Sequence, residues 1–170
     1  MSVEGCKKGW FQKWKGWEGC FSDSIGASGG LGIMWKSSCC ILEPLVVDSN
    51  FIWCKVFVKH SDESFFLCDV YGPSNLIKKR DLWSKLHLVL DSAVNSKIVV
   101  TGDFNATLSD LDKWGGIQWQ PRSQVDFTSF VSSTKLVDME PSLGWFTWNN
   151  QRPGLSSMAV HLDRFIVSEI

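Results

Sequence analysis

The segment Ile98-Val99-Val100-Thr101-Gly102-Asp103-Phe104-Asn105 decides the fold of this chain. Its apolar first half, ended by a glycine, is typical of a buried strand. Side chains two positions apart on an extended segment share one side, so Asp103 and Asn105 are expected to face one point. A carboxylate can take a proton from water or bind a divalent cation, and a carboxamide can donate to a phosphate oxygen. The pair suits phosphoester hydrolysis; the alternative is a plain turn after a strand, which also favours Asp and Asn.

Length and composition indicate one globular domain. A chain of 170 residues buries roughly 70% of its extended-chain surface, and 44% hydrophobic with 21% charged residues excludes a disordered chain. The sequence has neither an apolar run that could cross a bilayer nor a signal peptide, so we expect no membrane partner and an intracellular location. The net charge of −1 excludes an overall basic surface of the kind that nucleic-acid binders usually carry. The sequence does not indicate the oligomeric state.

The first 25 residues are expected to form a separate basic and aromatic segment, followed by a domain over 26–170. Trp10, Trp14 and Trp17 recur at helical spacing among lysines, although glycines weaken such a helix. We expect these tryptophans to dock on the domain; the alternative is an arm that binds DNA.

Cysteine usage indicates reduced thiols. The cysteines all lie in the first 68 residues, and none forms a C-x-x-C pair. Without a secretion signal, we predict mostly buried, small apolar residues rather than a disulfide framework or a zinc site. The cysteines are Cys6, Cys20, Cys39, Cys40, Cys54 and Cys68.

Strand signals dominate the first half of the chain. A glycine-rich loop at 26–30 leads into a buried strand at 31–35. Runs of β-type residues at 40–47, 51–59 and 65–71, separated by polar turn residues, predict an antiparallel meander.

The second half alternates helices and strands. A single apolar face predicts a helix over 78–95 before the strand at 98–101. We interpret 106–122 as a long loop whose Trp114 and Trp119 fold onto the body. The remaining elements are a helix at 125–133, strands at 145–148 and 159–162, and a turn at 149–154. This order predicts an α/β or α+β fold, with a mixed sheet packed by helices.

Three further positions are candidates for the site. Tyr71 is the only tyrosine and ends a strand, where its phenol could donate to a phosphate oxygen or simply pack. Asp163 could orient a histidine, as in a catalytic triad, or pair with Arg164. His161 is expected to be an exposed strand residue. Thr147 could hydrogen-bond an active-site carboxylate or merely occupy a strand position.

Several motifs, taken in order, resemble the endonuclease/exonuclease/phosphatase superfamily with its DNase I-like fold. More narrowly, they resemble the endonuclease domain of non-LTR (LINE-type) retrotransposon proteins. The motifs are Gly26-Ala27-Ser28-Gly29-Gly30 running to Trp35, Val70-Tyr71-Gly72-Pro73, Arg80-Asp81-Leu82-Trp83, Gly102-Asp103-Phe104-Asn105, residues 127–136, Phe146-Thr147-Trp148 and Leu162-Asp163-Arg164-Phe165. The resemblance implies a four-layer sandwich of two mixed β-sheets flanked by helices, and a partial domain over 26–170.

The resemblance also implies roles for the candidate residues in nicking DNA with Mg²⁺ or Mn²⁺, in the nucleus if the retroelement origin holds. Asp103 would align or deprotonate the attacking water, and Asn105 would bind the phosphate. Tyr71 would lie near the scissile phosphate. Asp163 would orient a catalytic histidine, with Thr147 in support.

Two motifs of the family have no counterpart in this sequence. These are the Gln-Glu-Thr-Lys-like motif with the metal-binding glutamate, and the closing Ser-Asp-His motif. The fold is therefore expected to be incomplete at both termini, with the principal metal ligands missing. We expect little or no nuclease activity, because interdependent catalytic groups lose most of their effect when one is removed. We also expect marginal stability, because missing edge strands would leave sheet edges and inner faces bare. A catalytically dead binding module and a phosphatase acting on phosphoinositides or other small phosphoesters are the alternatives.

Overall fold

The computed structural model describes residues 14–23, 30–116 and 121–169. Its centre is a six-stranded mixed sheet with the strand order β3-β4-β5-β6-β11-β8. The bounds are β3 (Cys40–Val47), β4 (Phe51–Val58), β5 (Ser64–Tyr71), β6 (Ile98–Asp103), β11 (Asp163–Ser168) and β8 (Leu136–Asp138). The predicted antiparallel meander is confirmed in β3, β4 and β5. The fold is of the α+β type, as predicted.

Helix α1 (Leu76–Asp91) carries the chain from β5 to β6, which pair in parallel. The helix begins before the predicted Lys78, because the Asn75 side chain accepts hydrogen bonds from the backbone N–H groups of Ile77 and Lys78. It ends before the predicted Asn95. Helix α2 (Pro121–Thr134) also begins earlier than expected, with proline at the first helical position.

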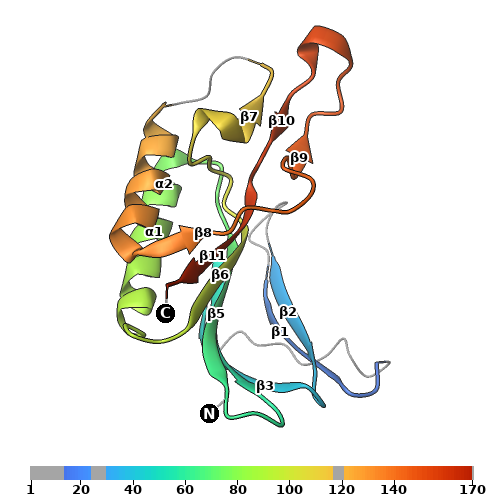
Figure 1. The fold of residues 1–170 in the computed structure, drawn as a ribbon, viewed down its shortest axis with the longest axis vertical. Helices are drawn as coiled ribbons and strands as arrows, with labels where there is room; N and C mark the ends of the chain where they lie inside the picture. The colour runs from blue at the N-terminus through green and yellow to red at the C-terminus, as the bar shows by residue number, and fades with distance from the viewer. Residues whose placement is uncertain (1–13, 24–29, 117–120, 170) are drawn as a thin grey trace.

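The main core lies between these two helices and one face of the sheet (Figure 1). Leu86, Phe104 and Phe127 are fully buried, and the Trp83 ring stacks on Phe127 and Phe130 with centroids 5.1 Å apart in each case. Burying one such side chain contributes about 1.5–3 kcal/mol. The aromatic cluster therefore fixes both helices on the sheet.

A hairpin of β1 (Trp17–Ser22) and β2 (Leu31–Lys36) packs on the opposite face, over the meander. The hairpin and meander share a second core of Cys20, Trp35, Leu42, Ile52, Cys54 and Val56. Strand β4 supplies both cores because its side chains alternate between the faces. The strand predicted at 31–35 is confirmed as β2, but its burial is only partial: Trp35 is buried, and Leu31 and Ile33 are half-buried against the second core.

The N-terminal tryptophans do not form a helical stripe. Gly16 takes a positive φ of 82° and Trp17 begins β1, so the chain is extended where a helix was considered. Trp14 and Trp17 are 56% and 39% exposed and contact each other edge to face. Their docking on the domain is therefore not observed, and Trp10 lies outside the described residues.

The described cysteines differ in how far they are buried. Cys20, Cys54 and Cys68 are buried, as predicted, whereas Cys39 is exposed and Cys40 is half-buried. Cys6 and the loop 26–29 lie outside the described residues.

A small sheet projects beyond the end of β6, with the strand order β7-β10-β9. Its strands are β7 (Lys113–Trp114), β9 (Trp148–Asn149) and β10 (Ala159–Val160), with short 3₁₀ turns at Asp110–Asp112 and Gly154–Ser156. The strands predicted at 145–148 and 159–162 are thus shorter than expected. The predicted loop 106–122 contains a strand, and Trp114 stays 56% exposed instead of folding onto the body. Trp119 lies outside the described residues.

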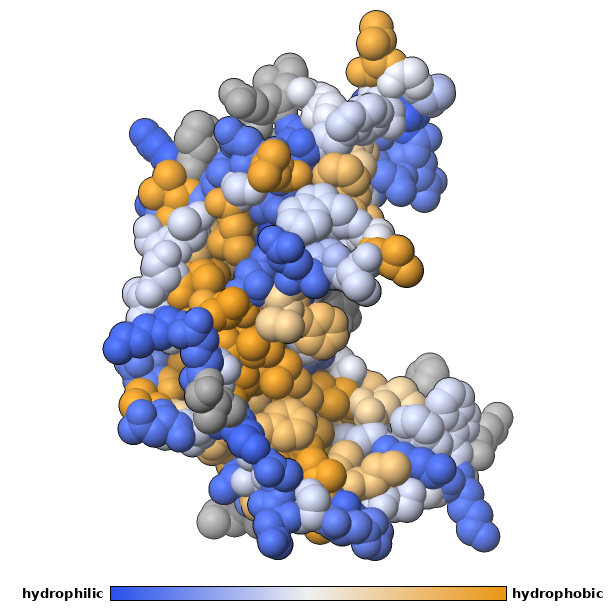
Figure 2. All heavy atoms as spheres, viewed as in Figure 1, coloured by the Kyte–Doolittle hydropathy of each residue, from blue (hydrophilic) through white to orange (hydrophobic). Residues whose placement is uncertain are grey.

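The small sheet and the hairpin project to the same side, leaving a hollow between them (Figure 2). The described elements form a helical layer, the six-stranded sheet and the hairpin. A second helical layer, which the four-layer expectation requires, is not among the residues that the structure describes. No helix in these residues is long and apolar enough to span a bilayer.

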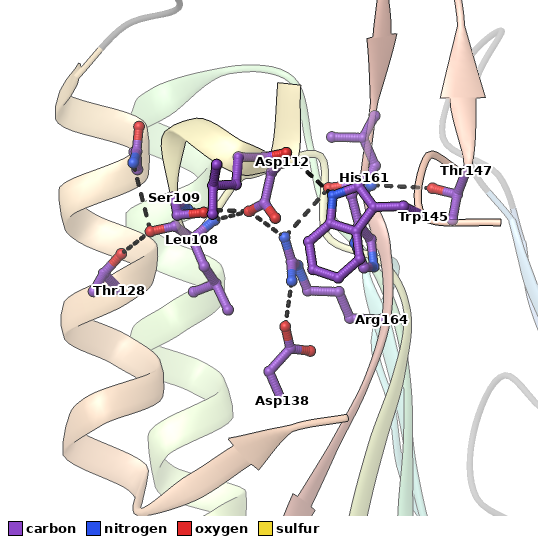
Figure 3. Close-up of polar contacts among 12 residues, drawn as sticks. Leu108, Ser109, Asp112, Thr128, Asp138, Trp145, Thr147, His161 and Arg164 are labelled. Atoms are coloured by element: carbon purple, nitrogen blue, oxygen red, sulfur yellow. Dashed lines mark hydrogen bonds and ion pairs between the residues drawn. The ribbon is translucent and has the colours of Figure 1, made fainter. Parts of the chain in front are cut away.

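Buried ion pairs attach the loop after β6 to the sheet (Figure 3). The Arg164 guanidinium of β11, only 3% exposed, pairs with both Asp112 and Asp138. The Asp112 carboxylate also accepts from the backbone N–H groups of Leu108 and Ser109. Arg164 therefore pairs with distant acids rather than with the neighbouring Asp163.

His161 is buried, with 2% exposure, so the prediction of an exposed strand residue is wrong. Its ring meets Trp145 edge to face at 4.9 Å, and its backbone N–H donates to the Asp112 carbonyl (Figure 3). Burial and the nearby Arg164 charge lower the pKa of His161. Its neutral ring thus packs beside the ion-pair network.

The first prediction concerns this network. Replacing Asp112 with alanine leaves Arg164 with one acidic partner and leaves two backbone donors unpaired, so the free energy of unfolding should fall by about 3–5 kcal/mol. Urea unfolding measures the change. Asp126→Ala is the control, because Asp126 pairs with the exposed Arg80, and it should change stability little. Equal effects of the two substitutions would contradict the assignment.

The second prediction concerns Asp69, which lies in register with Ile52 and Thr101. Burial raises the pKa of Asp69 from 3.8 to about 6. The folded state therefore holds the proton more tightly than the unfolded state, and stability is lost as pH rises from 3.8 through about 6. Asp69→Asn should raise the melting temperature above this window and change it little below. A substitution effect that is independent of pH would contradict the shift.

Candidate functional site

A cavity of about 270 Å³ lies where β5 and β6 end and α2 begins. It brings together three residues predicted from the sequence, Tyr71, Asp103 and Asn105. The parallel register sets Tyr71 directly beside Asp103. Other lining residues are Ala106, Thr107, Ser123, Gln124, Trp148, Val160 and Leu162.

The backbone places Asp103 and Asn105 together by a different route from the expected one. The chain does not stay extended, because Gly102 and Asn105 both take positive φ values, of 127° and 47°. A Cβ at Gly102 would lie 2.1 Å from the Val70 carbonyl oxygen, so only glycine fits there. The Asn105 backbone N–H then donates to an Asp103 carboxylate oxygen at 2.8 Å. A turn, rather than an extended segment, therefore aligns the pair.

The Asn105 carboxamide connects the ends of the two strands. Its Nδ2 donates to the Gly72 carbonyl at 2.7 Å and lies 3.5 Å from the second Asp103 carboxylate oxygen. The first contact is strong and the second is long. Asn105 therefore orients Asp103, and its longer contact is the one that a phosphate oxygen could replace.

Groups around Asp103 shift the pKa of its carboxyl in opposite directions. Burial raises the pKa of Asp103, and the Asp163 charge raises it further; Asp163 lies in register with it on β11. The Asn105 N–H and the Lys79 charge act in the opposite direction. The net result is a carboxylate with a raised pKa, which takes up a proton more readily than an exposed aspartate.

Lys79 is a candidate residue that the sequence reasoning missed. It is 3% exposed, and its ammonium donates to the Asn105 carbonyl and, at 3.0 Å, to Ser123 Oγ. Burial lowers the pKa of Lys79, while Asp103 raises it. The available signal was its place on the apolar face of α1 with Leu82 and Trp83, where a lysine is unusual.

The other candidates lie at the rim or outside the cavity. Thr147 Oγ1 accepts from the backbone N–H groups of Leu162 and Asp163, at 3.0 Å each (Figure 3). It therefore fixes the start of β11, and within the described part of the chain it bonds to no carboxylate. Asp163 is exposed and does not line the cavity.

The Tyr71 hydroxyl, in contrast, lines the cavity. It has no hydrogen-bond partner among the described residues, so it is available to a ligand.

Asp103 and Asp163, which lie in register on neighbouring strands, are the two carboxylates that come closest to forming a metal site. Magnesium is usually bound by one or two carboxylates with water and substrate phosphate. Among residues 14–23, 30–116 and 121–169, no three His, Cys, Asp or Glu side chains gather as a metal site. The residues described do not make a complete site, so the chemistry below depends on the chain's own groups.

Comparison with known proteins gives matches at the level of structure. No family model and no curated protein matches the chain. Among solved structures, the endonuclease domain of TRAS1, a telomere-specific non-LTR retrotransposon, superposes with a TM-score of 0.68 at 13% identity, over 92% of this chain and 68% of that one.

Two proteins from Bacteroides thetaiotaomicron are similar as well. An endonuclease/exonuclease/phosphatase family protein has a TM-score of 0.55 at 16% identity, over 93% of this chain and 63% of that one. A mannosyl-6-phosphatase has a TM-score of 0.57 at 15% identity, over 91% and 63%. This chain thus spans less than two thirds of these two structures.

Identities this low are evidence of a shared fold and not of a shared activity. The chain therefore has a DNase I-like fold, that of the endonuclease/exonuclease/phosphatase proteins, and resembles a retrotransposon endonuclease domain among them.

Proposed function

We propose that this chain is part of a phosphodiesterase that nicks DNA. The observation that carries the proposal is the cavity in which a carboxylate, a carboxamide and a phenol converge at two strand ends, the phenol having no hydrogen-bond partner among the described residues. The similarity to the TRAS1 endonuclease domain supports DNA as the substrate. We propose the same activity for a longer protein that contains this chain.

Asp103 acts on the attacking water in this mechanism. Its raised pKa makes it a better proton acceptor than an exposed aspartate, and the Asn105 N–H fixes one of its oxygens. The other oxygen faces the Asn105 amide across the longer contact. When a phosphate enters, that amide can donate to the phosphate instead, and water can take its place beside the carboxylate.

Tyr71 and Asp163 complete the proposed set. The Tyr71 phenol donates to a phosphate oxygen or to the leaving alkoxide. Asp163 acts on Asp103 through its charge, by raising the pKa of that carboxyl. Thr147 has a supporting role, because its hydroxyl accepts from the backbone N–H of Asp163 and so fixes the start of β11.

Attack on a phosphodiester also needs its negative charge to be neutralised. A divalent cation, Mg²⁺ or Mn²⁺ by resemblance, would supply this when bound. Lys79 supplies positive charge from behind Asn105, although its ammonium is held by a carbonyl and a hydroxyl. We propose that cleavage by this chain alone is slow.

A small-phosphoester phosphatase is the second candidate. The cavity volume of about 270 Å³ suits one phosphorylated group, and the similarity to a mannosyl-6-phosphatase is in keeping with this. The two candidates share Asp103 and Asn105 and differ in the substrate that reaches them.

The third prediction tests both candidates. Asp103→Asn should lower the nicking of supercoiled plasmid in Mg²⁺ or Mn²⁺ by about 10²–10⁴-fold, because it removes the proton acceptor. Asp62→Asn, in an exposed turn, is the matched control and should change nothing. The wild-type rate should fall as pH drops through the raised pKa of Asp103.

Three outcomes would contradict the proposal in different ways. Turnover of mannose 6-phosphate without nicking would favour the phosphatase. DNA binding without any cleavage would favour a binding module of the same fold. Nicking that survives Asp103→Asn would disprove the site.

The fourth prediction concerns Lys79. Lys79→Met removes a positive charge beside Asp103 and the donor to the Asn105 carbonyl. The pKa of Asp103 should rise, so the acid limb of the pH–rate profile should move to higher pH. Lys79→Arg should restore part of the wild-type profile, and Lys78→Met, at an exposed position, should leave it unchanged. A loss of melting temperature without a shift in the profile would indicate a structural role alone.

A further inference from the structure

A groove adjoins the candidate cavity on the side of the loop that carries β7. Its volume is about 710 Å³, and it lies between residues 107–116 and helix α2, which are side by side in Figure 1. Thr107 and Gln124 line both the groove and the cavity, so the two spaces are adjacent. The volume is in the range of ligand sites, roughly 300–1,000 Å³.

Hydrogen bonds and a buried ion pair fix the walls of the groove. The Thr128 hydroxyl donates to the Leu108 carbonyl at 3.1 Å, and Gln124 Nε2 reaches the same oxygen at 3.5 Å. The buried pair of Asp112 and Arg164 fixes the other side of the loop. Helix and loop therefore form a preformed groove, which costs little ordering energy on binding.

The polar groups of the groove suit a phosphate backbone. Ser109 and Ser129 supply hydroxyls, and Lys113 supplies an ammonium near Gly116. Hydroxyls, amides and lysines are the groups that proteins use to position phosphates. Asp110 also lines the groove, so its charge is mixed. Such a groove would bind a strand through hydroxyl donors and few ionic contacts.

The sizes of the cavity and the groove indicate how a long substrate would be distributed between them. A cavity of about 270 Å³ takes one phosphate with little more than its sugar, so the rest of a DNA strand must lie outside it. The groove is the described space next to it. We propose that the groove binds the nucleotides that flank the phosphate held in the cavity. This inference rests on the proposed function and makes a polynucleotide, rather than a small phosphoester, the substrate.

A charge placed in the groove tests the inference. Ser129→Glu adds a carboxylate at an exposed position of α2 that lines the groove. Ser84→Glu makes the same change at an exposed position of α1. Binding of fluorescein-labelled single-stranded DNA, as a dinucleotide and a hexanucleotide, is measured by fluorescence anisotropy. The hexanucleotide should bind about tenfold more tightly to the wild type, and Ser129→Glu should remove most of that gain while Ser84→Glu keeps it.

Salt dependence gives an independent readout. Lys113→Gln should reduce the slope of log affinity against log salt by about 1 for the hexanucleotide. Lys36→Gln, on the exposed side of β2, should leave the slope unchanged. Equal affinities for the two oligonucleotides, or equal effects of the two glutamates, would overturn the inference.

Binding and cleavage can fail separately. Groove-dependent binding without nicking would uphold the groove and reject the nuclease. Nicking that depends on Asp103, together with binding that is insensitive to Ser129→Glu, would uphold the nuclease and reject the groove.

Discussion

The site depends on the parallel pairing of β5 with β6. This register sets Tyr71 beside Asp103, and it is possible only because Gly102 lets the chain pass close to the Val70 carbonyl. The crossover through α1 makes the two strands parallel, and both strand ends then point to the same edge of the sheet. A shift of one residue in this pairing would turn Tyr71 to the other face. The cavity is thus a consequence of strand register.

Two buried cations hold the loops around that edge. Lys79, from a helix, fixes the backbone of Asn105, and Arg164, from a strand, fixes the loop that contains Asp112. Each cation lies on the side of an element that faces the core, where a charge is costly unless it is paired. Their partners lie far away in sequence, so these contacts form only when the helices have packed on the sheet. Loop geometry and core packing are therefore coupled.

The sequence predicted the meander, both helices and the grouping of Tyr71, Asp103 and Asn105, because these follow from local periodicity and from a family resemblance. It failed where long-range contacts decide. Asp112 looks like an ordinary turn residue until Arg164 lies against it, and His161 looks like an exposed strand residue until Trp145 covers it. Helix ends shifted because Asn75 caps α1. The bend at Asn105 could not be read from alternation alone, since a positive φ reverses the expected direction of a side chain.

The lone phenol gives the protein an internal reporter. Tyr71 is the one tyrosine of the sequence, and it lines the cavity, whereas the tryptophans are spread through the chain. Any signal specific to tyrosine, such as ionisation followed by ultraviolet difference spectroscopy or nitration followed by mass spectrometry, therefore arises at one known place. Occupancy of the cavity can be followed in the unlabelled protein, without adding a probe that would itself disturb so small a space.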